Sequence, residues 1–130
     1  MCAVKAMKDR LEDIFFWQQR FNETLRRERH LDYDAATWLQ KEALALIVEL
    51  GEVLEEARYK WWKNAEPIQL DKLHEELVDV LHFFVSMCID AGLDAEALYQ
   101  GYLAKNRENF RRQQGVSEKP GYQLPPSSNV

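Results

Sequence analysis

The chain has 130 residues, of which 46% are hydrophobic, 30% charged and 12% aromatic, values that indicate one globular domain and exclude a largely disordered chain. The net charge of −5 argues against a nucleic acid polymer as partner, because such binding needs a basic surface. The charged start does not resemble a signal peptide and no apolar run could cross a bilayer, so we expect a cytoplasmic protein with no membrane partner.

Apolar residues at helical spacing, with few glycines and prolines before residue 115, predict an all-α fold. In chain order, the expected helices cover about 5–27, about 34 or 35 to 59, about 69–91 and about 95–114. Gly92 and Gly115 are the expected stops of the last two helices.

Four helices of this length predict a four-helix-type bundle. The connection between the second and third helices is short, so these two should be antiparallel neighbours. Apolar residues on more than one helix face predict that a second copy of the chain completes the core, as a homodimer. We expect residues 1–115 to form the helical domain and residues 116–130, rich in Pro, Ser and Gly, to form an irregular tail.

Four acidic residues recur at three-residue spacing, Glu49 and Glu52 on the second expected helix and Glu76 and Asp79 on the third. Side chains three apart are neighbours on a helix, so two antiparallel helices can bring both pairs to one level. Four carboxylates would repel one another there without a cation, and Mg²⁺ prefers such oxygen ligands. Spacing alone leaves both a metal site and an ordinary solvated edge open. The third expected helix should bury an apolar stripe of Leu77, Val80, Leu81 and Phe84. Glu75 also shares a face with Asp79, but Glu76 lies nearer this stripe and is the preferred ligand.

A ferritin-like di-iron site is the main competing interpretation among helical carboxylate proteins. That design needs Glu-x-x-His pairs, and the sequence contains none, since His82 follows Asp79 as Asp-x-x-His. Redox di-iron chemistry is therefore not expected. We interpret His82 as a hydrogen-bonded residue at the edge of the core rather than as a metal ligand.

The two acidic pairs resemble those of the all-α nucleoside triphosphate pyrophosphohydrolases, a superfamily that includes the MazG-like proteins and the dimeric dUTPases. Residues 59–84, with KWWK near their start and Asp79-x-x-His82-Phe83 near their end, are most similar to the dimeric dUTPase branch. Two further motifs resemble that branch, Gln18-x-x-Phe21-Asn22 and the late Lys105-x-x-x-Asn109-Phe110-x-Arg112-Gln113.

The resemblance covers about residues 11–115. The chain departs from the family's pattern after the late motif, where Gly115-Val116 stands in place of Gly-Tyr. Tyr122 in the tail is the residue that could substitute for the missing tyrosine.

The resemblance implies Mg²⁺-dependent hydrolysis of dUTP to dUMP and pyrophosphate by a homodimer. The alternative is a related enzyme that acts on another nucleoside triphosphate, such as dCTP or a modified nucleotide. Two or more Mg²⁺ ions are implied, with Mn²⁺ as an alternative. The alternative to an enzyme is a non-catalytic helical protein that binds a partner through an acidic face.

Roles for single residues also follow from the resemblance. The implied metal ligands and catalytic residues are Glu49, Glu52, Glu76 and Asp79, with Glu49 orienting or deprotonating the attacking water. The implied substrate contacts are Gln18 and Asn22 for the uracil edge, Trp61 and Phe83 for an aromatic wall, and Lys60, Lys63, Lys105, Asn109 and Arg112 for the phosphates.

Overall fold

The computed structural model describes residues 9–127, and the described chain is built from helices without any strand. The helices are α1 (Arg10–Glu28), α2 (Ala35–Glu56), α3 (Leu70–Asp90) and α4 (Ala95–Gln113). The all-α prediction is therefore confirmed, with each expected helix present. The start predicted near residue 5 lies outside the described residues. None of the described helices is both long and apolar enough to cross a membrane.

Local side-chain and backbone chemistry fixes the ends of the helices. The carboxylates of Asp9 and Asp34 accept hydrogen bonds from backbone N–H groups at 3.2 Å and 2.8 Å, so α1 and α2 begin directly after them. Gly92 and Gly115 adopt φ angles of 77° and 74° just beyond α3 and α4, as the sequence predicts. α2 ends before the predicted residue 59 because Arg58 also adopts a left-handed φ, 58°.

The chain separates into two compact units, which meet in the sequence between Asp94 and Ala95. The first unit contains α1, α2 and α3, and the second contains α4 with the segment that follows it. Residues 116–127 form no helix or strand. The division expected after residue 115 stays a prediction.

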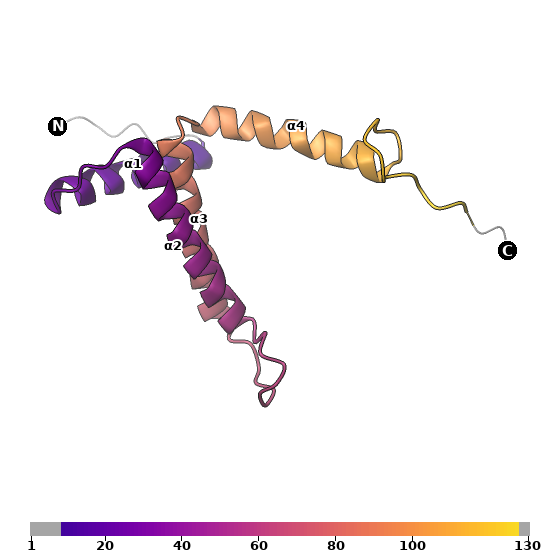
Figure 1. Cartoon of the computed structure of the whole chain (residues 1–130), viewed down its shortest axis with the longest axis horizontal. Coiled ribbons are helices and arrows are strands. Elements are labelled where there is room, and N and C mark those ends of the chain that lie inside the picture. Colours follow the sequence, from indigo (N-terminus) through magenta and orange to yellow (C-terminus); the bar gives the residue numbers. More distant parts are fainter. Residues whose placement is uncertain (1–8, 128–130) are drawn as a thin grey trace. The chain divides into compact units, whose positions relative to one another are not determined.

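In the first unit, α2 and α3 pack side by side as an antiparallel pair (Figure 1). α1 packs against α3 and runs in the same direction, since their hydrogen-bonded side chains occur in the same order along both helices. Phe15 of α1 and Val85 and Cys88 of α3 are buried. This small core brings polar faces of all three helices together.

Much of the apolar surface of the first unit is left uncovered within one chain. Leu77, Leu81 and Phe84, which lie on the expected buried stripe of α3, are 49%, 42% and 42% exposed. On α2, Leu44 and Ile47 are 63% and 62% exposed. Full burial of the stripe is not reached because too few helices of the same chain cover it. Large uncovered apolar surfaces are typical of interaction interfaces.

Candidate active site

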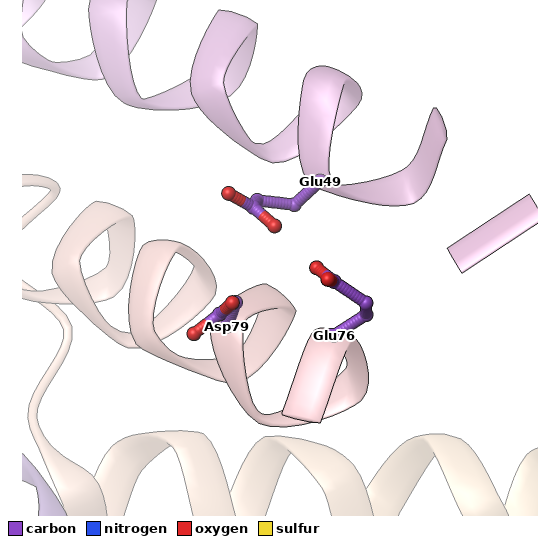
Figure 2. Close-up of side chains that lie close together, drawn as sticks. All are labelled: Glu49, Glu76 and Asp79. Carbon is purple, nitrogen blue, oxygen red and sulfur yellow. The ribbon is translucent and has the colours of Figure 1, made fainter. Parts of the chain in front are cut away.

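Three carboxylate groups converge between α2 and α3 (Figure 2). Glu49 comes from α2 and Glu76 and Asp79 from α3, and each contributes an oxygen that lies within 4.8 Å of the others. Glu76 and Asp79 are three residues apart, so both project from the side of α3 that faces Glu49. Glu75 is exposed and does not belong to this carboxylate cluster.

Glu52, the fourth expected ligand, lies on the next turn of α2 and is exposed. It is not among the three residues whose oxygens lie within 4.8 Å of one another. Its carboxyl group instead lies close enough to that of Glu76 to raise the pKa of Glu76. Glu52 therefore borders the carboxylate cluster through Glu76.

Burial and mutual repulsion raise the pKa values of two cluster residues. For Glu49 the main cause is burial, followed by the negative charge of Glu52. The pKa of Glu76 rises to about 7, first because of the neighbouring Glu52 carboxyl group and then because of burial. Both shifts mean that a second negative charge is difficult to hold at this place without a cation.

The donor atoms of the carboxylate cluster fit a hard cation. The Oε2 atoms of Glu49 and Glu76 are buried and find no hydrogen-bond partner among the described residues, as does Oε2 of Glu42 two turns earlier on α2. Such buried unpaired polar atoms are uncommon in proteins and call for an explanation. Carboxylate oxygens grouped in this way are the ligands that Mg²⁺ takes, so the residues present fit the implied metal.

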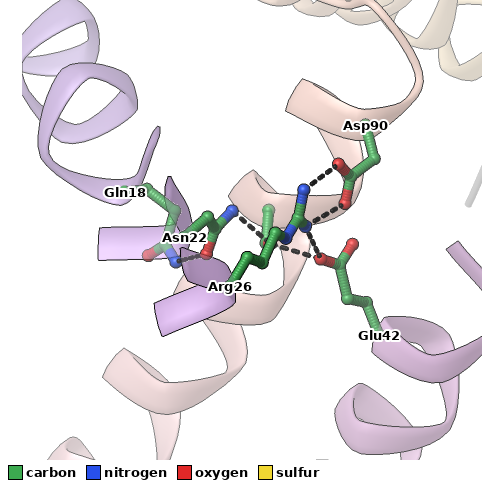
Figure 3. A network of polar contacts seen from close by, with 6 residues as sticks. Gln18, Asn22, Arg26, Glu42 and Asp90 are labelled. Atoms are coloured by element: carbon green, nitrogen blue, oxygen red, sulfur yellow. Dashed lines mark hydrogen bonds and ion pairs between the residues drawn. The ribbon is translucent and has the colours of Figure 1, made fainter. Parts of the chain in front are cut away.

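A second polar cluster, here called the buried network, links α1, α2 and α3 (Figure 3). Three side-chain pairs are hydrogen-bonded between α1 and α3. They are Gln18–His82 at 2.8 Å, Asn22–Ser86 at 2.8 Å, and Arg26–Asp90 at 3.0 and 3.1 Å. Gln18 also donates to Asn22 at 3.0 Å, and both side chains are 8% exposed. The two amides expected to meet a base are thus already bonded within the chain.

Glu42 of α2 closes the buried network from the other side. Its Oε1 atom accepts hydrogen bonds from Ser86 at 2.6 Å and from Arg26 at 3.1 Å. Burial is the main cause that raises the pKa of Glu42 to about 7, followed by the neighbouring Asp90 carboxyl group. The guanidinium of Arg26 lies between the two carboxyl groups and 3.9 Å from the ring centroid of Trp38. Arg26 therefore holds two acidic groups that would otherwise repel each other.

The buried network and the carboxylate cluster occupy successive levels of the same interface. Glu42 precedes Glu49 by seven residues on α2, and Ser86 follows Asp79 by seven on α3. Seven residues are two helical turns, or about 10 Å. His82 lies between the two levels, three residues after Asp79.

Sequence reasoning missed four members of the buried network, Arg26, Glu42, Ser86 and Asp90. A signal was nevertheless present, because Gln18, Asn22 and Arg26 recur at four-residue spacing. His82, Ser86 and Asp90 repeat the same spacing on α3. Two polar rows of equal period indicate two helix faces that can pair.

The connection between α2 and α3 carries three expected substrate contacts, Lys60, Trp61 and Lys63. They line a hollow of ≈ 650 Å³ together with other residues of this connection. Trp61 is 85% exposed and meets Trp62 edge-on, with ring centroids 4.7 Å apart. Lys60 is paired with Glu55 at 2.8 Å. The remaining aromatic candidate, Phe83, is half-buried on α3.

Three further candidates, Lys105, Asn109 and Arg112, lie on α4 in the second unit. Lys105 and Asn109 are exposed. Arg112 is half-buried, forms an ion pair with Glu108 at 3.3 Å, and lies 5.6 Å from the ring centroid of Tyr122. The tail tyrosine thus contacts the late motif, while contact of these residues with phosphates stays a prediction.

Comparison with known proteins gives one family and two relatives. A family model described as dUTPase matches residues 10–97, which include all of α1, α2 and α3. A dCTP pyrophosphatase of Enterobacteria phage T4 is 31% identical over 104 residues, or 62% of this chain and 61% of that protein. A dCTP pyrophosphatase of Enterobacteria phage LZ5 is 34% identical over 74 residues, or 57% of this chain and 43% of that protein. The chain thus spans less than two thirds of either relative, and no solved structure gives a significant match.

Proposed function

We propose, because the chain belongs to the dUTPase family, that it hydrolyses dUTP to dUMP and pyrophosphate. The observation that carries this proposal is the convergence of Glu49, Glu76 and Asp79 at one place between α2 and α3. The buried and unpaired oxygens of Glu49 and Glu76 are suited to a divalent cation, and a nucleoside triphosphate is a substrate that such a cation accompanies.

The proposed metal ligands are Glu49, Glu76 and Asp79, with Glu52 at the edge of the carboxylate cluster. Bound Mg²⁺ would neutralise charge on the phosphate oxygens and allow the anionic substrate to approach four acidic groups. Glu49 is the residue that we expect to orient or deprotonate the attacking water. Without metal, burial raises the pKa of Glu49. A bound cation would keep its carboxylate ionised and therefore able to accept a proton from water.

The remaining groups are assigned by their chemistry. Lys60 and Lys63 would contribute positive charge from the connection after α2, and Lys105 and Arg112 would do so from α4. Gln18 is bonded to His82, one turn from Asp79, and Asn22 is bonded to Gln18, so the exposed imidazole is the group of this set that could meet a base.

A second candidate substrate is dCTP. Both relatives are named dCTP pyrophosphatases, which favours a cytosine nucleotide on the same metal scaffold. The two substrates differ only in the base, so the carboxylate cluster would serve either reaction unchanged.

We also propose that the chain works as a homodimer. Apolar side chains on α2 and α3, among them Leu44, Ile47 and Leu77, are between 49% and 63% exposed in one chain. A second copy that packs on these helices would bury them, and burial of apolar surface is the main favourable contribution to association.

The experiment that tests the proposal is pyrophosphate release from dUTP and from each common deoxynucleoside triphosphate, with and without Mg²⁺. The expected result is Mg²⁺-dependent formation of dUMP and pyrophosphate, with little turnover of the purine nucleotides. Turnover of dCTP in preference to dUTP would replace the first candidate by the second. No turnover of any nucleotide would contradict both and favour a non-catalytic helical protein.

A further inference from the structure

The hydrogen bonds of the buried network have a direction that one residue fixes. The guanidinium of Arg26 can only donate, and it donates to Oε1 of Glu42 at 3.1 Å. That oxygen is therefore an acceptor, and the Ser86 hydroxyl, 2.6 Å away, must donate its only proton to it. The lone pairs of Ser86 Oγ are left for the side chain on its other side.

Each further step follows from the one before it. Ser86 accepts from the amide nitrogen of Asn22 at 2.8 Å, so the Asn22 oxygen points the other way. That oxygen accepts from the amide nitrogen of Gln18 at 3.0 Å, which turns the Gln18 oxygen toward His82. The oxygen can only accept, so the proton of a neutral His82 ring lies on Nδ1, 2.8 Å away. Nε2 then carries a lone pair and is an acceptor.

The chain of hydrogen bonds ends at the edge of the carboxylate cluster. His82 is exposed and lies on the turn of α3 that follows Asp79. The other end of the hydrogen-bond chain, at Arg26 and Asp90, lies two turns further along α3. A partly buried ion pair is thus connected, through neutral side chains, to an exposed imidazole beside the proposed metal ligands.

We propose that Ser86, held by Glu42, is a positioning residue for base selection. Through Asn22 and Gln18, its hydroxyl keeps His82 in the Nδ1–H form and presents Nε2 as an acceptor to an N–H group of the nucleobase. This inference rests on the proposed function, because the base lies beside His82 only if the triphosphate lies at the carboxylate cluster.

The direction matters because the two candidate bases have opposite hydrogen-bonding edges. Uracil presents a donor at N3 and an acceptor at O4, whereas cytosine presents an acceptor at N3 and a donor at N4. At ring position 3, the Nε2 acceptor meets a donor in uracil but another acceptor in cytosine, so this direction of the chain favours uracil. Without the Ser86 hydroxyl, the side-chain amides of Asn22 and Gln18 can both rotate by half a turn. Both directions of the hydrogen-bond chain are then populated, and discrimination between the two bases falls.

The first test needs no substrate. Nitrogen-15 NMR of the protein at a pH of about 8.5, where an ordinary imidazole is neutral, reports the tautomer of each of the three histidines. His82, identified with His82→Asn, is expected in the Nδ1–H form in the wild type and predominantly in the more common Nε2–H form in Ser86→Ala. An Nε2–H form in the wild type would overturn the proposal without any variant.

The second test measures kcat/KM for dUTP and dCTP and takes their ratio. Ser86→Ala should bring the ratio at least about tenfold closer to one, and Ser86→Thr, which keeps the hydroxyl, should restore it. Cys88→Ala is the matched control, since it also shortens a buried α3 side chain but lies outside the buried network.

An unchanged ratio in Ser86→Ala, or a wild type that does not discriminate, would overturn the role in base selection. A wild type that hydrolyses no nucleotide would instead refute the proposed function. In that case the tautomer spectrum still decides whether the hydrogen-bond chain has the direction inferred here, so the two failures are distinguishable.

Discussion

The amide of Asn22 on α1 donates a hydrogen bond to the hydroxyl of Ser86 on α3 at 2.8 Å, although the two residues are 64 positions apart in the chain. The pairs on either side of it, Gln18–His82 and Arg26–Asp90, have the same separation of 64. A constant separation requires two helices that run in the same direction and in one register. The buried network therefore fixes how α1 lies on α3 and at which level their side chains meet.

Arg26→Ala should destabilise the protein. The substitution leaves the Glu42 and Asp90 carboxyl groups without their shared cation, and we expect a loss of about 2–3 kcal/mol in the free energy of unfolding. The loss should fall below that of a fully buried pair because the Arg26 side chain is 25% exposed. Chemical denaturation measures it. The control is Arg27→Ala, an exposed neighbour expected to change stability by less than about 0.5 kcal/mol. Equal effects of both substitutions would contradict the role given to Arg26.

The stability of the metal-free protein should fall as pH rises from about 4.5 to about 7. Over this range Glu42 keeps its proton in the folded protein, where its pKa is about 7, but loses it in the unfolded chain, where it is near 4.5. The folded state binds more protons, so the free energy of unfolding decreases with increasing pH. Glu42→Gln should reduce this slope. Denaturation at several pH values would contradict the prediction if both proteins show the same slope.

The helices and the carboxylate cluster could be predicted from sequence because both depend on local spacing. Helical periodicity located α1 to α4, and three-residue spacing with a short connection placed Glu76 and Asp79 opposite Glu49. Which residues form the buried network, by contrast, depends on which turn of α1 packs against which turn of α3. That register is set by packing between distant segments, and composition and spacing do not contain it.

Individual departures from the sequence predictions also have physical causes. The end of α2 at Glu56 depends on a left-handed φ at Arg58, a conformation that non-glycine residues adopt only occasionally. Leu81 and Phe84 were expected in a core, but one chain does not supply enough helices to cover them. Gln18 and Asn22 were expected to face a base, and their amides bond first to Ser86 and His82.

Removing one charge from the carboxylate cluster should stabilise the metal-free protein and abolish its response to Mg²⁺. At a pH above about 7, where Glu76 is ionised, Glu76→Gln removes a charge that the Glu52 carboxyl group and burial disfavour, so the melting temperature without metal should increase. Added Mg²⁺ should raise the melting temperature of the wild type by mass action and leave that of the variant unchanged. Differential scanning calorimetry with and without Mg²⁺ measures both effects. A variant that melts lower than the wild type and still responds to Mg²⁺ would contradict the assignment.

A charge placed on the uncovered apolar surface should dissociate the proposed homodimer. Ile47 is 62% exposed on α2, and Ile47→Glu would put an unpaired carboxylate into the interface. Sedimentation equilibrium should give twice the chain mass of 15.4 kDa for the wild type and the single mass for this variant. Gln40→Glu, an exposed polar position on the same helix, is the control and should remain dimeric. A monomeric wild type would refute the homodimer.

The most direct test of the central claim, that the carboxylate cluster is an active site, is Mg²⁺-dependent pyrophosphate release by three proteins in one assay. These are the wild type, Asp79→Asn and Glu75→Gln, where Glu75 is an exposed carboxylate on α3 outside the cluster. We predict that Asp79→Asn lowers kcat/KM by at least about 100-fold while Glu75→Gln stays within about threefold of the wild type. Equal activity of all three proteins, or equal loss in both variants, would contradict the claim.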